Sequence, residues 1–286
     1  MTRPVLRYHG GKFRLAPWIV SFFPVHQTYV EPFGGAASVL MNKPRAHSEV
    51  YNDVADEIVN VFRVLRDPGQ AARLARLVDL TPFARTEFEL SYEPSDDPVE
   101  QARRTVVRSF MGHGSGAVYC KHATGFRTGL RGTGQKSAAY DLLTWAEQVP
   151  AFVERLRGVT IESRDALYLM RRTDGPGTLF YVDPPYPLAT RGNARGVRQK
   201  YAQELTDDDH RSLAGVLRDL HGMMVVLSGY PTPLYDRELF PDWFRVECPA
   251  LADGARPRVE VLWINQACVR ALERERRQLH MPLEAA

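Results

Sequence analysis

The residues best suited to chemistry lie in residues 179–186, where an apolar run ends in Asp183, Pro184, Pro185 and Tyr186. The two prolines fix φ and remove two backbone donors, so nearby carbonyls stay available as hydrogen-bond acceptors. A carboxylate and a carbonyl beside an aromatic ring suit a planar group with an amino function, such as a nucleobase edge. The alternative is a strand that Pro-Pro merely ends; the flanking Asp183 and Tyr186 favour the binding site.

Two glycine-rich turns stand earlier in the chain. The first, residues 31–35, follows an apolar run, and its glycines allow backbone to approach a ligand closely. Asp53 ends the next expected strand, where a carboxylate can accept from ribose hydroxyls. The three spaced glycines of the dinucleotide fingerprint are missing, which disfavours NAD. The second turn, residues 8–12, lacks the first glycine and the Ser/Thr of a Walker phosphate loop.

The composition is that of an ordinary globular protein. The chain has 286 residues, 44% of them hydrophobic and 25% charged, which excludes disordered, collagen-like and disulfide-scaffold classes. No apolar run approaches the roughly 20 residues of a membrane span. Residues 1–15 lack the apolar stretch of a signal peptide, and Cys120, Cys248 and Cys268 are widely spaced. These features predict a cytoplasmic protein, and the scattered histidines predict no metal site.

The net charge of +3 conceals two basic stretches. Residues 101–140 and 184–203 contain no Asp or Glu, yet they carry eleven Lys and Arg side chains. Segregated positive charge on glycine-rich loops is typical of a polyanion-binding surface, although a solvated basic loop is the alternative. The predicted nucleic-acid contacts are Arg108, Lys121, Arg127, Arg131, Lys136, Arg191, Arg195, Arg198 and Lys200.

Strand and helix patterns alternate along most of the chain. Apolar or aromatic runs predict strands at 28–31, 49–52, 159–163, 179–183, 223–228, 244–247 and 259–265. Helical patterns cover 12–21, 36–41, 56–65, 207–220, 234–240 and the tail after 268. The alternation predicts an α/β fold with a mainly parallel seven-stranded sheet. The last two strands have no clear helix between them, which predicts an antiparallel edge hairpin.

The alternation breaks between residues 66 and 157. Helices are expected at 71–80, 99–108 and 145–157, around a glycine-rich loop or small hairpin at 111–135. A loop-rich segment of this length is usually functional. We therefore expect a catalytic domain of residues 1–65 and 158–286 with an inserted subdomain at 66–157. Phe110, Tyr119 and Phe126 could stack on bases or form that subdomain's core.

Together, these segments resemble the Dam-type DNA adenine-N6 methyltransferases (D12 class, alpha group). The resemblance covers most of the chain and follows the family's motif order. The insert departs from the best-known members and looks closer to phage-type relatives, which leaves the target sequence open. The matching segments are residues 8–12, 30–35, 52–53 with Asp56, Glu57 and Asn60, 182–186, 227–230 and 260–263.

The resemblance implies a Rossmann-like class I methyltransferase that uses S-adenosylmethionine on double-stranded DNA in a bacterial or phage-infected cell, without an obligate protein partner. Asp53 would contact the cofactor's ribose and Asp165 its adenine, while Tyr8 and Lys12 would border its methionine end. The full set of implied cofactor residues is Tyr8, Gly11, Lys12, Glu31, Phe33, Gly34, Gly35, Asp53 and Asp165.

The implied chemistry addresses a weak nucleophile, because the lone pair of an exocyclic adenine amine is delocalised into the ring. Hydrogen bonds to Asp183 and to the Pro184 carbonyl would favour a pyramidal nitrogen, and Tyr186 would stack on the base. The base must be flipped out of the duplex to reach such a pocket. Methylation of cytosine N4 or of adenine in RNA, and a non-catalytic DNA-binding relative, remain alternatives. A glutamine-methylating enzyme is disfavoured, because that group usually carries Asn where Asp183 stands.

Overall fold

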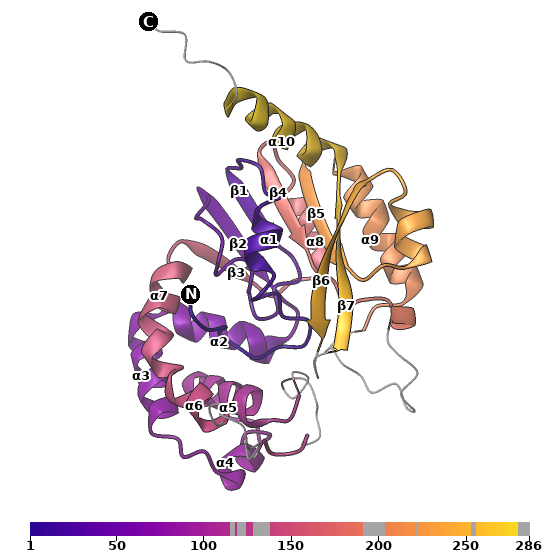
Figure 1. Cartoon of the computed structure of the whole chain (residues 1–286). Coiled ribbons are helices and arrows are strands. Elements are labelled where there is room, and N and C mark those ends of the chain that lie inside the picture. The colour runs from indigo at the N-terminus through magenta and orange to yellow at the C-terminus, as the bar shows by residue number, and fades with distance from the viewer. Residues whose placement is uncertain are drawn as a thin grey trace, which may run out of the picture.

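The computed structural model describes residues 1–114, 118, 124–127, 138–190, 204–220, 222–252 and 256–279. Seven strands form one sheet in the order β3-β2-β1-β4-β5-β7-β6 (Figure 1). Strands β1 to β5 are parallel, and β7 runs antiparallel to both β5 and β6. The predicted mainly parallel sheet with an antiparallel edge hairpin is confirmed. The strands are β1 (Thr28–Glu31), β2 (Ser48–Asn52), β3 (Val159–Glu162), β4 (Thr178–Val182), β5 (Met224–Gly229), β6 (Phe244–Ala252) and β7 (Arg256–Ile264).

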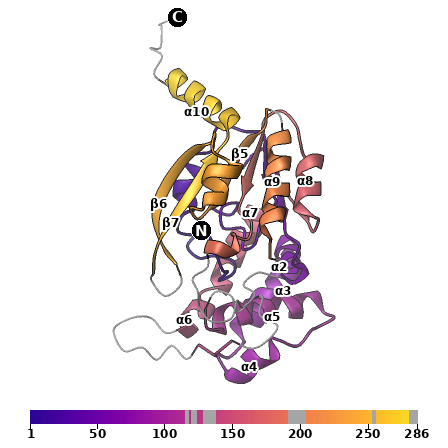
Figure 2. The same cartoon turned by 90° about the vertical axis from the view of Figure 1, so that its right-hand side faces the viewer.

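Helices cover both faces of the sheet, which explains why the residues of its central strands β4 and β5 are all buried. On one face, Val30 and Phe180 pack in a core with α8 (Ala166–Arg172), α9 (Asp207–Asp219) and the π-helix η4 (Leu234–Leu239) (Figure 2). On the other face, Tyr29 and Tyr181 pack in a core with α1 (Ala16–Val20), α2 (Asp56–Arg66) and α10 (Gln266–Leu279). Consecutive residues of one strand therefore pack in different cores, because their side chains point alternately to the two faces of the sheet.

A group of short helices lies below the sheet in Figures 1 and 2. Its core is continuous with that of the sheet, because buried residues of α5, including Phe110, join the same cluster as α2. Phe126 contacts the rings of Phe83 and Phe88, so both of these expected aromatic residues serve the core. The helices are α3 (Pro68–Asp79), α4 (Arg85–Leu90), α5 (Pro98–Met111), α6 (Ala138–Leu143), the 3₁₀ turn η2 (Ala146–Gln148) and α7 (Val149–Leu156). A further 3₁₀ turn, η3 (Leu188–Thr190), follows β4.

None of the helices among the described residues is long and apolar enough to cross a membrane. Within the segment at 111–135, which was expected to be a glycine-rich loop or a small hairpin, Gly112 and Phe126 form an isolated antiparallel bridge. Tyr119 lies outside the described residues.

The helix predicted at residues 36–41 is wrong, because this segment forms successive turns. Gly35 has φ of +48° and Ala37 has φ of +52°, a left-handed conformation that a right-handed helix cannot include. The backbone N–H of Leu40 donates to the Glu31 carboxylate at 3.0 Å instead of to a helical carbonyl. The predictions also missed the short helices α4, α6 and α8, each of seven residues or fewer.

Candidate active site

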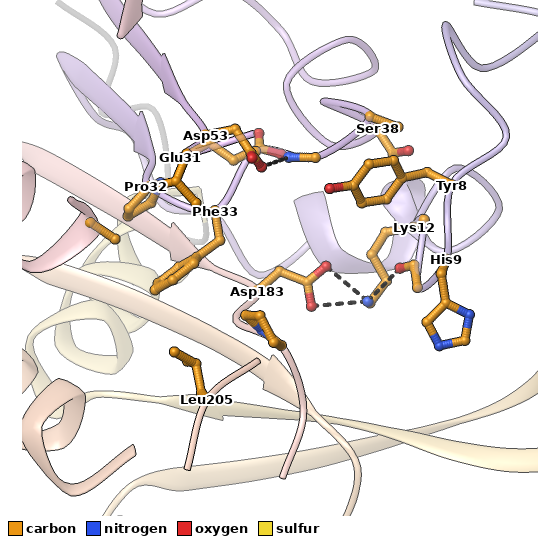
Figure 3. Close-up of a pocket in the computed structure, with 18 of the residues that line it drawn as sticks. Tyr8, His9, Lys12, Glu31, Pro32, Phe33, Ser38, Asp53, Asp183 and Leu205 are labelled. Carbon is orange, nitrogen blue, oxygen red and sulfur yellow. Dashed lines mark hydrogen bonds and ion pairs between the residues drawn. The ribbon is translucent and has the colours of Figure 1, made fainter. Parts of the chain in front are cut away.

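A cavity of about 220 Å³ opens at the carboxyl ends of β1, β2 and β4 (Figure 3). Strand β1 lies between β2 and β4, so the chain changes direction across the sheet here. Open α/β sheets bind ligands at such a switch point. All nine residues expected at a cofactor line the cavity, together with two from the proline motif: Tyr8, Gly11, Lys12, Glu31, Phe33, Gly34, Gly35, Asp53, Asp165, Asp183 and Pro185.

The Gly34-Gly35 turn lines the cavity and packs closely against β2 and against the N-terminal segment that carries Tyr8. The N–H of Gly34 donates to the carbonyl of Asn52 at 2.7 Å. A Cβ on Gly34 would lie 2.2 Å from the Tyr51 ring, and one on Gly35 would lie 2.5 Å from the Tyr8 ring. Both glycines are therefore required by space, and Gly35 is also required by its positive φ.

Replacing Gly35 with alanine is expected to lower the free energy of unfolding by roughly 2–4 kcal/mol, since left-handed strain adds to overpacking. Gly158 is a matched control, because it has φ of +79° but no atom within 4 Å of a built Cβ. Gly158→Ala should cost only the strain, about 1–2 kcal/mol. Urea unfolding of both variants measures the difference, and equal losses would show that the contact with Tyr8 carries no cost.

Asp53 shapes the turn through both of its carboxylate oxygens. Oδ2 accepts from the N–H of Gly35 at 2.8 Å, and Oδ1 accepts from the N–H of Ala55 at 2.8 Å. Burial raises the pKa of Asp53, while these backbone N–H groups oppose the rise. Each carboxylate oxygen has a second acceptor site, so Asp53 can also accept from a hydroxyl in the cavity.

The neighbouring Asn52 is fully buried and joins the loops that follow three strands. Its amide donates to the carbonyls of Pro32 and Arg164 and accepts from the N–H of Arg164. Sequence reasoning quoted Asn52 only as part of a motif. The structure shows that it fixes the loops carrying Phe33 and Asp165 relative to each other.

Asp165 caps helix α8, where its side chain accepts from the N–H of Tyr168 at 2.8 Å. The cap holds the exposed carboxyl group at the rim of the cavity. Capping by Asp is favoured because its oxygen satisfies an N–H that has no partner within the helix.

Glu31 is a buried carboxyl group at the end of β1, with 2% of its surface exposed. Its Oε2 accepts from the Tyr29 hydroxyl at 2.8 Å and from the N–H of Leu40. Burial raises the pKa of Glu31 to about 8, and the hydrogen bond from Tyr29 opposes this rise. Glu31 therefore holds a proton at neutral pH.

Asp183 follows β4 and is held from two sides. Lys12 Nζ lies 2.9 Å from Oδ1 and 2.8 Å from Oδ2 (Figure 3). The Ser228 hydroxyl donates to Oδ1 at 2.8 Å. Tyr181 contacts the same Ser228 hydroxyl at 3.0 Å. Lys12, which was expected beside a cofactor's methionine end, thus contacts the carboxylate of the proline motif. Ser228 was quoted in a motif without a role.

Tyr186 is 5% exposed, and its hydroxyl donates to Glu260 on β7. Its ring meets Tyr230 edge-on at 4.7 Å between centroids, and Lys12 Nζ lies 4.9 Å from its centre. Sequence reasoning did not assign Glu260 a role. The available signal was a charged residue within the apolar run of the last strand.

Of the basic residues predicted to bind nucleic acid, the structure describes Arg108 and Arg127. Arg108 is 5% exposed, pairs with Glu57 on α2, and lies over the Tyr92 ring, so it joins α5 to its neighbours. Arg127 is partly exposed and pairs with Asp141 at 3.0 Å. The others lie outside the described residues: Lys121, Arg131, Lys136, Arg191, Arg195, Arg198 and Lys200.

Comparison with known proteins adds independent findings. A family model described as D12 class N6 adenine-specific DNA methyltransferase matches residues 8–97. A DNA adenine methylase of Serratia marcescens is 25% identical over 257 residues, which cover 85% of this chain and 87% of that protein. A DNA adenine methylase of Vibrio cholerae serotype O1 is 26% identical over 243 residues, which cover 80% of this chain and 82% of that protein.

The match to the family model begins at Tyr8 and includes the Gly34-Gly35 turn and Asp53. The similarity to the methylases extends over most of each chain, and the sheet order agrees with a Rossmann-like methyltransferase. The chain is therefore similar to the D12 class of N6 adenine-specific DNA methyltransferases over residues 8–97 and to DNA adenine methylases over most of its length.

Proposed function

We propose that this protein transfers the methyl group of S-adenosylmethionine to N6 of an adenine that has been flipped out of double-stranded DNA. One observation carries the proposal: Asp183, followed by two prolines and a tyrosine, lines a cavity at the switch point of the sheet. The Asp183 carboxylate gives the cavity an acceptor for an exocyclic amine, and the D12 class is described by adenine N6 methylation.

The cavity residues fit S-adenosylmethionine. Phe33, Val54 and Leu167 supply apolar contacts for an adenine ring, while Asp53 has acceptor sites for ribose hydroxyls. The Gly34-Gly35 turn lets the backbone at the cavity lie directly against the Tyr51 and Tyr8 rings, where a Cβ would not fit. Tyr8, Lys12 and Glu31 would border the methionine part, and Asp165 the adenine. When bound, this cofactor supplies a methyl group that is already activated on a sulfonium sulfur.

Asp183 and Pro184 prepare the amine for reaction. Asp183 Oδ1 already accepts from Lys12 and Ser228, whereas Oδ2 accepts from Lys12 and keeps a second acceptor site. The target amine would donate to Oδ2 and to the Pro184 carbonyl, which favours a pyramidal nitrogen with an available lone pair. The amine becomes acidic only as its new bond to carbon forms, so Asp183 receives the proton at that stage.

Several observations favour adenine in DNA over the alternatives. The family description and both methylases name adenine and DNA, whereas cytosine N4 and RNA have no such support. A non-catalytic relative would have no need to retain the polar groups of the site, and Asp53, Asp183 and Tyr186 are all present.

Two measurements test the function. A thermal-shift titration with S-adenosylmethionine should stabilise the protein, whereas a relative without a functional pocket should not respond. Single-molecule sequencing of DNA from cells that express the protein should reveal N6-methyladenine at one recognition sequence. Methylation confined to cytosine or to RNA would contradict the proposal.

We also propose that residues 66–157 form the target-recognition subdomain and that Arg127 contributes to a DNA-facing surface. Arg127 belongs to the first acid-free stretch, and its backbone is held by a hydrogen bond from its N–H to the Met111 carbonyl. Its guanidinium shares Asp141 with Arg3, so two cations face one carboxylate. The excess positive charge favours a phosphate.

Arg127→Ala is expected to weaken DNA binding and to reduce the slope of log K against log salt by about 0.9, the value for one lost phosphate contact. Arg131→Ala should behave alike. Arg218 is a matched control. It lies in helix α9, outside both acid-free stretches of the sequence, and like Arg127 it pairs with an aspartate, Asp242 at 2.6 Å. Fluorescence anisotropy at several salt concentrations measures both slopes. If Arg127→Ala keeps the wild-type slope, Arg127 does not contact phosphate.

A further inference from the structure

Glu260 is a charged residue in an otherwise apolar stretch of β7. Only 3% of its surface is exposed. Side chains two apart on a strand share a face, and Leu262 and Ile264 on the same face of β7 are buried in the core. A buried carboxylate is costly unless it is bonded and paired, so its contacts indicate what it does.

Its contacts lead to two residues of the proposed active site. The Tyr186 hydroxyl donates to Glu260 Oε1, and Lys12 Nζ lies 3.5 Å from the same oxygen. Lys12 is 4% exposed and also donates to the Gly10 carbonyl at 2.7 Å. Two carboxylates, the part-buried Asp183 and the buried Glu260, therefore face one buried ammonium.

The charges of this cluster decide how well Asp183 can accept from an amine. If Lys12 faced Asp183 alone, the pair would be neutral, and each hydrogen bond from Lys12 would compete with the target amine. The negative charge of Glu260 attracts the same ammonium from the other side. Lys12 can then give up contact with Asp183 without becoming an unpaired buried charge, which would be very unfavourable.

We propose that Glu260 is a positioning residue for methyl transfer: it fixes Tyr186 through a hydrogen bond and takes over Lys12 when the target amine binds Asp183. The inference rests on the proposed adenine methylation and adds a residue and a contact to it. Glu260 acts through Lys12 and Tyr186 and does not touch the reacting atoms.

Glu260→Gln tests the charge, because the amide oxygen can still accept from Tyr186. Single-turnover methyl transfer at saturating DNA and cofactor is expected to slow at least tenfold, while the Kd values for DNA and for S-adenosylmethionine stay within threefold. Glu247→Gln is a matched control, because Glu247 lies on the adjacent strand β6 and pairs with Arg245 at 2.6 Å. This variant should transfer methyl groups at the wild-type rate.

A double-mutant cycle with Lys12→Met identifies the route of the effect. If Glu260 acts through Lys12, Glu260→Gln should slow a Lys12→Met protein by less than twofold. Independent, multiplicative losses would overturn the proposal, as would a folded Glu260→Gln protein with the wild-type rate. If Glu260→Gln does not fold, Glu260→Asp keeps the charge but retracts it by one methylene, and a wild-type rate for that variant overturns the proposal equally. Failure of the wild-type protein to methylate adenine in DNA would instead remove the proposed function itself.

Discussion

Asp183→Asn is expected to lower the single-turnover rate of methyl transfer by roughly 10³-fold, and Asp183→Ala is expected to abolish it. Asparagine keeps the shape of the side chain but cannot receive the proton. Its amide N–H₂ group also stands where one carboxylate oxygen was, so it can present a donor to the target amine instead of an acceptor. The affinity for S-adenosylmethionine should stay within severalfold, because the Gly34-Gly35 turn and Asp53 are unchanged. Transfer of a tritiated methyl group to DNA measures the rate, and isothermal titration measures the affinity.

The same substitution removes the main partner of a buried ammonium. Lys12 is 4% exposed, and Glu260 at 3.5 Å would be the carboxylate that still faces it, so Asp183→Asn should also lower the melting temperature. The double variant Asp183→Asn with Lys12→Met removes the buried positive charge and should recover stability while remaining inactive. Activity in the double variant would contradict the role of Asp183 in the chemistry.

The second large effect concerns the pH dependence of stability through Glu31. Its pKa of about 8 in the folded protein exceeds the ordinary value of 4.5, so the folded state binds the proton more tightly than the unfolded state. Between these pH values the unfolded state carries fewer protons, and the free energy of unfolding falls as pH rises. The fall contributed by Glu31 between pH 5 and pH 8 is about 3–4 kcal/mol.

Glu31→Gln isolates this contribution, because glutamine stays neutral across the range. Urea unfolding without ligand should show similar stability of the two proteins near pH 5 and a more stable variant at pH 8. Other titrating groups are common to both proteins and cancel in the comparison. Parallel stability curves for the two proteins would show that Glu31 is ionised throughout.

Much of the fold followed from local patterns. The central strands β4 and β5 were predictable because helices cover both faces of the sheet, so these two strands are mostly apolar. Parallel strands then bring their carboxyl ends to one edge, which places Glu31, Asp53 and Asp183 around one cavity. The predicted ends of β1 agree with the structure at both residues.

The contacts within the site were less predictable, because they join distant residues. Tyr186 and Glu260 are 74 residues apart in the sequence. No local pattern indicates that β7 lies next to β5, one strand away from β4, which brings Glu260 near the residues that follow β4. The missed turn at residues 36–41 has a different cause. Its composition suits a helix, but Gly35 and Ala37 adopt positive φ, and the Gly35 backbone packs tightly against the Tyr8 ring.

The turns at residues 36–41 have a consequence for which adenosine compounds the protein admits. Nucleotide-binding sheets usually aim a helix N-terminus at the phosphates, where the dipole and the unpaired N–H groups attract negative charge. Here a tight turn replaces that helix, and Glu31, Asp53 and Asp183 stand around the same space. A phosphate of ATP or NADP would therefore meet no helix N-terminus here and would approach the Asp53 carboxylate, whereas a cationic sulfonium would meet no such repulsion. We expect the backbone that follows β1 to disfavour these abundant nucleotides.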